Sequence, residues 1–168
     1  MPALHSDRMG DLSEFSFVVR AFLKAYPWRR IDPIPWTPLR KPLAEANVAL
    51  VTTAGLVMPD QKPFDDKIKG GDCSFRVIPS DADVSSLIDT HRSETFDHSG
   101  IQSDPNLAFP LDRLHELARD GIIGRVNRRH LSFMGSITAP GRLIRDTAPV
   151  AAQLLVEDNV DVALLVPV

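Results

Sequence analysis

The sequence predicts an α/β protein of three layers, in which helices flank a mainly parallel sheet that is incomplete at its C-terminal side. The apolar run Val48–Thr53 leads into the small residues Ala54 and Gly55, as a strand does before a βα loop. Leu143–Val156 has apolar residues at helical spacing, and the apolar run Val160–Val166 follows it. Continuous apolar strands that alternate with helices are typical of parallel sheets, whose strands are joined by right-handed crossovers.

The N-terminal part of the chain has a different composition from the rest. The chain has 168 residues, of which 43% are hydrophobic, so it can bury a core. Leu12–Tyr26 carries apolar residues at helical spacing and ends before Pro27. Several of the 14 prolines then follow closely, and proline favours extended connections because it fixes φ and lacks a backbone N–H. We therefore assign residues 1–43 to an N-terminal helix and proline-rich arm, and residues 44–168 to the α/β domain.

Local composition predicts the elements that follow the first strand. Polar, turn-rich stretches predict exposed loops over Met58–Gly71 and Phe96–Asn106. Alternation of apolar and polar residues over Ser74–Ile78 predicts an edge strand before Pro79. Apolar residues at helical spacing predict a short helical turn over Val84–Ile88.

The second half of the chain contains clearer signals. Leu111–Arg119 is predicted to be a helix, because Pro110 is tolerated in its first turn and Gly121 ends it. Ile122–Val126 is predicted to be a turn or a brief strand. His130–Ile137 is predicted to be a strand that runs into a loop.

The last two elements carry more specific expectations. Pro149 interrupts the helix Leu143–Val156, so we expect a break there, with Thr147 capping a second helical segment. The final apolar run, Val160–Val166, is predicted to be a buried parallel strand.

Charge and cysteine content argue against several classes of protein. The net charge is only -3, which gives no reason to expect a nucleic-acid partner. Cys73 is the single cysteine, and this excludes an internal disulfide framework or a cysteine-rich zinc site. No apolar stretch reaches about 18 residues, and Met1–Gly10 lacks the apolar core of a signal peptide, so we expect a cytoplasmic protein with no membrane partner. One short basic segment is interpreted as solvated surface rather than a nucleic-acid site: Arg125, Arg128, Arg129 and His130.

Candidate site residues stand at strand ends and in the polar loop. Ligands of α/β sheets bind beyond the carboxyl ends of the strands. The residues that we expect to line a substrate pocket are Thr52, Thr53, His98, Asp104, Asn106, Met134 and Gly135. Asp97, His98 and Asp104 are alternatively an acid/base set, a metal site, or residues that cap helices and turns. Cys73 lies in no CxxC pair, and we expect a small, half-buried structural residue rather than a nucleophile.

Six segments, in this order and spacing, resemble one known family. The segments are Val51–Leu56, Asp104–Leu114, Gly121–Gly124, Phe133–Ile137, Thr147–Pro149 and Val160–Pro167. They are similar to the selenoprotein B family of glycine, sarcosine, betaine and D-proline reductases, and most similar to the D-proline reductase type. The resemblance runs from about Ala44 to the end of the chain.

The resemblance implies a reductase chemistry that is incomplete within these residues. In the family, the strand that matches Val160–Val166 delivers a selenocysteine or cysteine nucleophile, and here no residue follows Val168. We expect that an in-frame UGA codon was taken as a stop; the alternative is a genuinely short form. The implied reaction is reductive cleavage of a C–N bond in a small-molecule substrate, an amino acid or its derivative, with His98 as proton donor to the departing amine.

The resemblance also implies cofactors and partners. It places no cofactor in this chain, and it implies a pyruvoyl group on a partner subunit and a dithiol or thioredoxin-like reductant. Two other functions remain open. The first is a non-enzymatic binding or assembly subunit that docks a partner through the uncovered sheet. The second is a metal-dependent hydrolase built on His91, Asp97 and His98. Homo-oligomer formation is left open.

Overall fold

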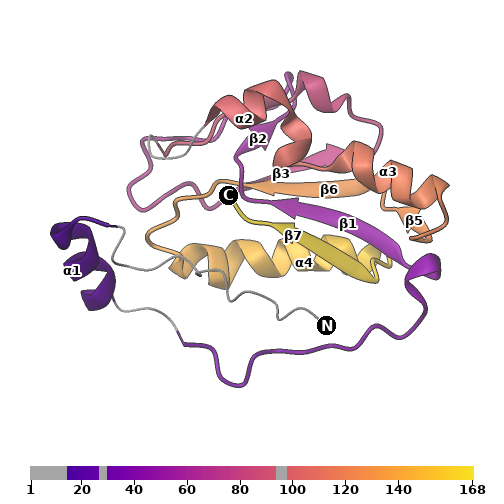
Figure 1. Cartoon of the computed structure of the whole chain (residues 1–168), viewed down its shortest axis with the longest axis horizontal. Coiled ribbons are helices and arrows are strands. Elements are labelled where there is room, and N and C mark those ends of the chain that lie inside the picture. Colours follow the sequence, from indigo (N-terminus) through magenta and orange to yellow (C-terminus); the bar gives the residue numbers. More distant parts are fainter. Residues whose placement is uncertain (1–14, 27–29, 94–97) are drawn as a thin grey trace, which may run out of the picture. The chain divides into compact units, whose positions relative to one another are not determined.

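The computed structural model describes residues 15–26, 30–93 and 98–168, which fall into two compact units, Met1–Thr37 and Pro38–Val168 (Figure 1). In the first unit, helix α1 (Phe17–Ala25) begins after Ser16, whose hydroxyl accepts a hydrogen bond from the Val19 N–H. None of the residues of α1 is buried. The second unit contains the sheet and is described below by itself.

The sheet is built around one central strand. Strand β1 (Asn47–Thr52) pairs in parallel with β5 (Arg125–Val126), β6 (Arg129–Phe133) and β7 (Val162–Val166). Strand β3 (Phe75–Pro79) pairs antiparallel with β6 at the far edge. Because β7 pairs along nearly the whole of β1, strands β5 and β6 share the other side of β1. The predicted mainly parallel sheet is confirmed.

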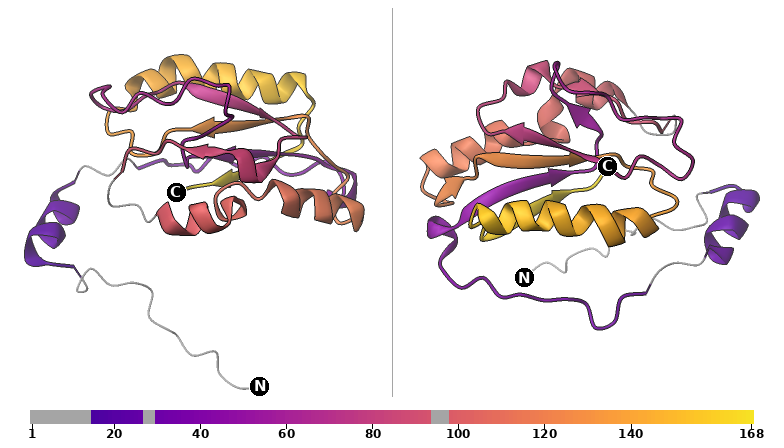
Figure 2. Two further views of the ribbon diagram at one scale, coloured as in Figure 1. Left: turned by 90° about the horizontal axis from the view of Figure 1, so that it is seen from above. Right: turned by 180° about the vertical axis from the view of Figure 1, so that it is seen from behind.

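Helices cover the two faces of this sheet, which makes three layers (Figure 2). On one face, α2 (His98–Ser103) and α3 (Leu111–Arg119) pack on a core that includes Leu50 of β1. On the opposite face, α4 (Ala148–Glu157) packs against Leu131 of β6. Successive side chains of a strand point to opposite faces, so each central strand contributes to both cores. The predicted three-layer α/β fold is confirmed.

Several short elements depart from the expectations. A two-stranded antiparallel sheet joins β2 (Leu56–Val57) to β4 (Ile88–Asp89), and the predicted helical turn is only the 3-10 helix η3 (Val84–Ser86). Strands of two residues give no alternation that a sequence pattern can reveal. The predicted loop over 96–106 contains α2 and the 3-10 helix η4 (Pro105–Leu107), and burial of Ile101 anchors α2.

The irregularity expected near Pro149 is present, but Thr147 does not act as predicted. A π-helical turn, η5 (Leu143–Thr147), runs directly into α4. Thr147 makes no side-chain capping bond, because its backbone is itself helical, with φ -93° and ψ -46°. Pro149 lies in the first turn of α4, where no backbone N–H is needed.

Within the described ranges, no helix has the length and apolar character that crossing a membrane requires.

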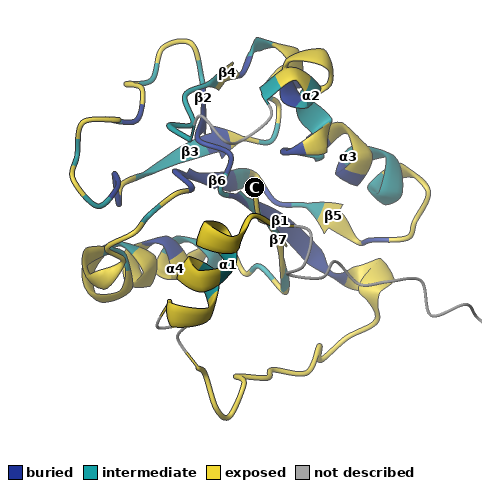
Figure 3. Cartoon of the chain, turned by 60° about the vertical axis from the view of Figure 1, so that its left-hand side comes forward, coloured by how far each residue is buried: buried dark blue, intermediate teal, exposed yellow. Residues whose placement is uncertain are grey.

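The prediction that the last strand is buried is wrong. Strand β7 lies at the edge of the sheet, and Leu164 and Leu165 are 41% and 67% exposed (Figure 3). The helices on the two faces of the sheet cover its central strands more completely than they cover β7. An edge strand presents unpaired backbone groups beside its side chains, so the apolar residues of β7 form an uncovered surface.

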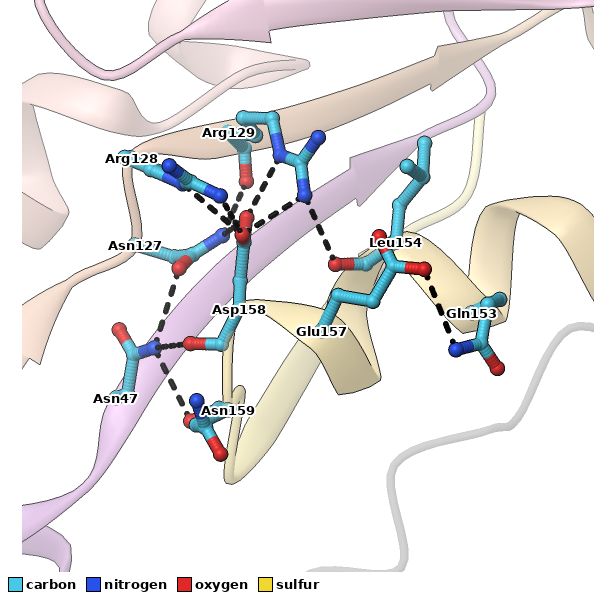
Figure 4. A network of polar contacts seen from close by, with 9 residues as sticks. All are labelled: Asn47, Asn127, Arg128, Arg129, Gln153, Leu154, Glu157, Asp158 and Asn159. Carbon is cyan, nitrogen blue, oxygen red and sulfur yellow. Dashed lines mark hydrogen bonds and ion pairs between the residues drawn. The ribbon is translucent and has the colours of Figure 1, made fainter.

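A buried carboxylate joins the amino end of β1 to two turns (Figure 4). Asp158, in the turn between α4 and β7, has a side chain that is only 1% exposed. It accepts hydrogen bonds from Asn127 (3.1 Å), from Arg128 (2.9 and 2.6 Å) and from Arg129 (2.8 and 2.8 Å). The bonds from Arg129 hold the pKa of Asp158 well below its usual range, although burial opposes them.

Asn47 extends this network to the first residue of β1. Its side-chain amide donates to the Asn127 side chain (3.1 Å) and to the main-chain carbonyls of Asp158 (3.1 Å) and Asn159 (3.2 Å). The interpretation of the basic segment as solvated surface is therefore wrong for Arg129, which binds Asp158, and for His130, which is fully buried. Arg128 and Arg129 compensate the buried charge of Asp158, which lies about 30 residues further along the chain.

Replacing Asp158 tests how much this network contributes to stability. We expect Asp158→Ala to lower the free energy of unfolding by about 2–3 kcal/mol, because it removes the charged acceptor that Asn127, Arg128 and Arg129 share. Urea denaturation measures the change. The matched control is Asp146→Ala, which removes an exposed ion pair with Arg145 and should cost at most about 1 kcal/mol. Equal effects of the two substitutions would contradict the role of the network.

Candidate functional site

The carboxyl ends of β1, β6 and β7 meet at one edge of the sheet, as parallel strands require. The Thr53 N–H donates to the Val166 carbonyl (3.1 Å), and Ala54 pairs with Met134 as an isolated bridge. The structure therefore brings together four of the seven predicted pocket residues, which are Thr52, Thr53, Met134 and Gly135. We call this region the carboxyl edge.

The two threonines have different positions at the carboxyl edge. Thr52 is fully buried, and its hydroxyl accepts from the Ala54 N–H (3.1 Å) and donates to the Val166 carbonyl (3.4 Å). Thr53 is half-buried, and its hydroxyl accepts from the Val168 N–H (2.9 Å). The same hydroxyl lies 3.4 Å from the Val168 carbonyl oxygen. Thr53 thus fixes the main chain that leaves β7, whereas Thr52 closes the end of β1.

His91 packs directly over the carboxyl edge. A Cβ at position 135 would overlap the His91 Nε2 atom and would lie 2.9 Å from the Thr53 carbonyl oxygen. Gly135 therefore permits a close approach that no other residue allows. Sequence reasoning placed His91 only in the metal-site alternative, because the two-residue strand β4 that precedes it has no recognisable pattern.

Hydrogen bonds connect His91 to His98, which is a predicted site residue. His98 Nδ1 bonds Asp89 Oδ2, and His98 Nε2 bonds the Ser93 carbonyl (3.1 Å). The Ser93 N–H donates to His91 Nδ1 (3.2 Å), and the two rings are 6.2 Å apart. Both of these partners of His98, the Asp89 carboxylate and the Ser93 carbonyl, are hydrogen-bond acceptors, so a protonated ring would donate to both.

The same network determines which His91 nitrogen carries the proton. With Nδ1 accepting from Ser93, neutral His91 holds its proton on Nε2, the atom that faces Gly135. Burial lowers the pKa of His91, and the neighbouring His98 lowers it further, although Asp89 opposes them. The lowered pKa favours the neutral form of His91 at pH 7.

The other two predicted pocket residues belong to η4: Asp104 is its N-cap residue and Asn106 lies within it. Asp104 accepts a hydrogen bond from the Asn106 N–H (3.0 Å). The Asn106 side chain bonds the carboxylate (2.9 Å) and the N–H (3.2 Å) of Asp112 at the start of α3. These are the bonds of a turn and a helix cap. No hydrogen bond that the structure describes links Asp104 or Asn106 to the carboxyl edge.

The remaining candidates for chemistry are a metal site and the cysteine. Asp97 lies outside the described residues, and the described ranges contain no group of three histidine, cysteine or acidic side chains placed to hold a metal ion. Cys73 is 7% exposed, and its thiol lies 3.7 Å from the Gly71 carbonyl oxygen. It occupies a buried position before β3, and is more buried than the half-buried residue that we expected.

An apolar cavity of about 320 Å³ opens beside the carboxyl edge, between the sheet and α4. Its wall includes Thr53 and Met134 of the edge, Ala151 and Leu155 of α4, and Leu165 of β7. The carboxyl edge is therefore bordered by an apolar cavity toward α4 and by the His91 and His98 network where His91 packs on Gly135.

Gly135→Ala tests the packing at the carboxyl edge. We expect a loss of about 1–3 kcal/mol in the free energy of unfolding, because the new methyl group must displace the His91 ring or the Thr53 main chain. The control is Gly141→Ala, since a Cβ there meets no atom within 4 Å. Chemical denaturation compares the two variants, and equal stability would show that His91 does not pack on Gly135.

Another histidine, His130, is buried in the sheet, and its burial predicts a stability that depends on pH. Its Nδ1 accepts a hydrogen bond from the Leu50 N–H (2.9 Å), and its ring meets that of Phe109 edge-on, with centroids 5.8 Å apart. Burial, aided by nearby His115, lowers the pKa of His130 to about 4. In the native state His130 is therefore neutral down to about pH 4.

The pH dependence of unfolding tests this assignment. In the unfolded chain the histidine pKa is about 6.5, so below that pH protons bind the unfolded state preferentially. Stability should be constant above about pH 7 and should fall by about 3 kcal/mol between pH 6.5 and 4. In His130→Asn, whose amide oxygen can still accept from Leu50, this part of the decline should disappear. An unchanged slope in denaturation between pH 7 and 5 would refute the assignment.

Comparisons with known proteins place the chain in a family. The family model of glycine/sarcosine/betaine reductase selenoprotein B matches residues 16–167. The chain is 38% identical over 136 residues to D-proline reductase subunit gamma of Acetoanaerobium sticklandii, which covers 80% of this chain and 54% of that subunit. It is 29% identical over 163 residues to sarcosine reductase complex component B subunit beta of Peptoclostridium acidaminophilum, covering 95% of this chain and 36% of the relative.

A third relative is also named as a component of a reductase complex. Glycine reductase complex component B subunit gamma of Symbiobacterium thermophilum is 30% identical over 117 residues, which cover 68% of this chain and 27% of the relative. The chain thus spans about half the length of the D-proline reductase subunit and a smaller share of the other two. No solved structure matches the chain. Since the family model covers nearly all of its residues, the chain belongs to the glycine/sarcosine/betaine reductase selenoprotein B family.

Proposed function

We propose that this chain is the scaffold of a selenoprotein B-type reductase subunit, which cleaves a C–N bond of an amino acid or derivative reductively. The observation that carries the proposal is family membership over residues 16–167, joined to the convergence of β1, β6 and β7 at one carboxyl edge. In parallel sheets this edge is where ligands bind. Relatives named as D-proline, sarcosine and glycine reductase subunits support the substrate class.

The nucleophile is supplied from outside these 168 residues. The family resemblance puts a selenocysteine or cysteine directly after the segment that matches β7, next to the main chain that Thr53 binds. Cys73, the single cysteine here, is buried in another part of the fold. A selenol or thiol at a strand end becomes a stronger nucleophile when its surroundings lower its pKa.

The reaction needs two electrons and two protons for each C–N bond. A dithiol, free or on a thioredoxin-like protein, provides both when it is oxidised to a disulfide. A pyruvoyl group on a partner subunit activates the substrate, and this chain holds no cofactor of its own. The relatives are named as components of reductase complexes, which supports a partner subunit. We assign proton supply to the pair of His98 and His91, because hydrogen bonds through Ser93 join them beside the edge.

The native subunit should show dithiol-dependent activity. We expect the protein purified from its own host to contain selenium or an additional cysteine, and to oxidise one dithiol for each amine released from D-proline, glycine, sarcosine or betaine. His98→Gln should lower kcat by about 10²–10⁴-fold, as loss of an acid/base group does. The 168-residue chain alone should be inactive. Activity of that short chain that is lost in Cys73→Ser, or a native protein without either nucleophile, would overturn the proposal.

A second function is favoured by the uncovered edge strand. Leu164 and Leu165 of β7 are exposed, and Leu165 also lines the apolar cavity, as expected for a binding or assembly subunit that docks a partner through its sheet. This function requires the 168-residue chain to be monodisperse on its own and to form a complex with a reductase component. Aggregation of the isolated chain, together with an active longer protein, would exclude it in favour of the reductase subunit.

A further inference from the structure

The carboxylate of Asp89 has no part in the function proposed above, although it contacts both histidines that we assign to proton supply. Asp89 ends strand β4, which lies beside α2, the helix that begins at His98 (Figure 3). Its Oδ2 atom bonds His98 Nδ1, and its Oδ1 atom accepts a hydrogen bond from the His91 N–H (2.9 Å). Each oxygen of the carboxylate therefore holds one histidine.

These two bonds close a circuit of four hydrogen bonds. His98 Nε2 bonds the Ser93 carbonyl (3.1 Å), and the Ser93 N–H donates to His91 Nδ1 (3.2 Å). The His91 N–H then returns the circuit to Asp89, which bonds His98 again. Neither imidazole ring can turn without breaking at least one of these bonds. The circuit therefore fixes the orientation of both rings, and Asp89 contributes two of its four bonds.

The main chain that carries Asp89 is anchored at the carboxyl edge. Strand β4 pairs with β2, and Asp89 lies opposite Leu56 in this pairing. The next residue, Thr90, donates to the Gly55 carbonyl from its N–H (3.1 Å) and from its hydroxyl (2.6 Å). The Gly55 N–H in turn donates to the Phe133 carbonyl of β6 (2.9 Å). The carboxylate of Asp89 is thus held in a fixed place relative to the strand ends.

The surroundings of Asp89 favour a cation beside it. Its side chain is only 12% exposed, and burying a carboxylate is costly unless a positive group compensates it. Arg92 is three residues away, but in the described structure its guanidinium donates to the Ile68 carbonyl (3.1 Å) and forms no ion pair with Asp89. His98 is the one ion-pair partner of Asp89 in the described part of the chain. The charge of Asp89 is therefore compensated when the His98 ring is protonated.

We propose that Asp89 is a positioning residue for proton supply, because its carboxylate keeps a hydrogen on His98 Nδ1 and favours the protonated ring. This role rests on the proposed reductase function. When protonated His98 gives the hydrogen on Nε2 to the departing amine, the neutral ring keeps its other hydrogen on Nδ1. The side chain of His98 is 30% exposed, so water can replace the lost proton. The electrons still come from the dithiol, and Asp89 remains a carboxylate throughout.

Nitrogen NMR of the histidine rings tests this contact in the 168-residue chain, without any activity. At about pH 8 we expect wild-type His98 to carry a hydrogen on Nδ1. In Asp89→Asn the amide oxygen still accepts from His91, and the amide nitrogen donates to His98 Nδ1, so the hydrogen of the neutral ring should move to Nε2. The matched control is Asp83→Asn, which should leave the His98 signals unchanged. Asp83 accepts from the Ser85 N–H (2.9 Å) in the same kind of turn, and its carboxylate bonds only Ser85 in the described structure.

Kinetics of the native subunit test the consequence for the reaction. Asp89→Asn should lower kcat by at least about tenfold and leave KM within about twofold, because proton supply changes and substrate binding does not. Combined with His98→Gln, it should cause no further loss, since Asp89 acts through His98.

Three results would overturn the role of Asp89. They are a wild-type His98 without a hydrogen on Nδ1 at about pH 8, an Asp89→Asn variant with the wild-type tautomer, and an Asp89→Asn variant with the wild-type kcat. The first result needs only the wild type, so it decides even if the variant does not fold. A native wild type that releases no amine would instead refute the reductase function, and the role of Asp89 with it.

Discussion

The buried carboxylate of Asp158 ties the turn between α4 and β7 to the start of β1. Asp158 turns the chain from α4 into β7, and five hydrogen bonds from three residues hold it in a place where an uncompensated charge would be very unfavourable. Through Asn47 the same cluster fixes the first residue of β1, the strand on which the sheet is built. The amino ends of the strands are therefore held by polar contacts, while the layers above and below are held by apolar packing.

The two ends of β1 consequently have different chemical character. At the amino end, arginines and asparagines surround a carboxylate, and their hydrogen bonds are largely fixed within the protein. At the carboxyl end, Thr53 and Gly135 leave the main chain accessible to a neighbouring side chain, and an apolar cavity adjoins them. Polar contacts therefore support one end of β1, and a tightly packed histidine and an apolar cavity adjoin the other.

The sequence predicted those features that depend on long, regular patterns. The apolar run over β1 and the helical spacing of α3 gave the correct elements, and the strand–helix–strand order gave a parallel last strand, although not its partner, β1. It did not reveal that β7 is exposed, because an apolar run is the same in a central strand and at an edge. The strands β2 and β4 were missed, because two residues are too few to show the apolar–polar alternation of a strand.

The site was predictable to the extent that it follows from strand ends. Thr53, Met134 and Gly135 could be identified because the ends of parallel strands coincide. His91 could not, since its place over Gly135 depends on a contact across 44 positions of the chain. Asp158 and Arg129 likewise gave no signal, because nothing in a sequence tells a paired buried charge from a solvated one.

The hydrogen bonds of Thr53 have a further consequence for the end of β7. Pro167 has no N–H, so the ladder between β1 and β7 cannot continue through it in the ordinary way. At Val168 the bond is made by the hydroxyl of Thr53 and not by its backbone. The main chain there is consequently tied to the sheet by one rotatable side chain. A change in the rotamer of Thr53 would release the end of the strand while every backbone pair of the sheet stays formed.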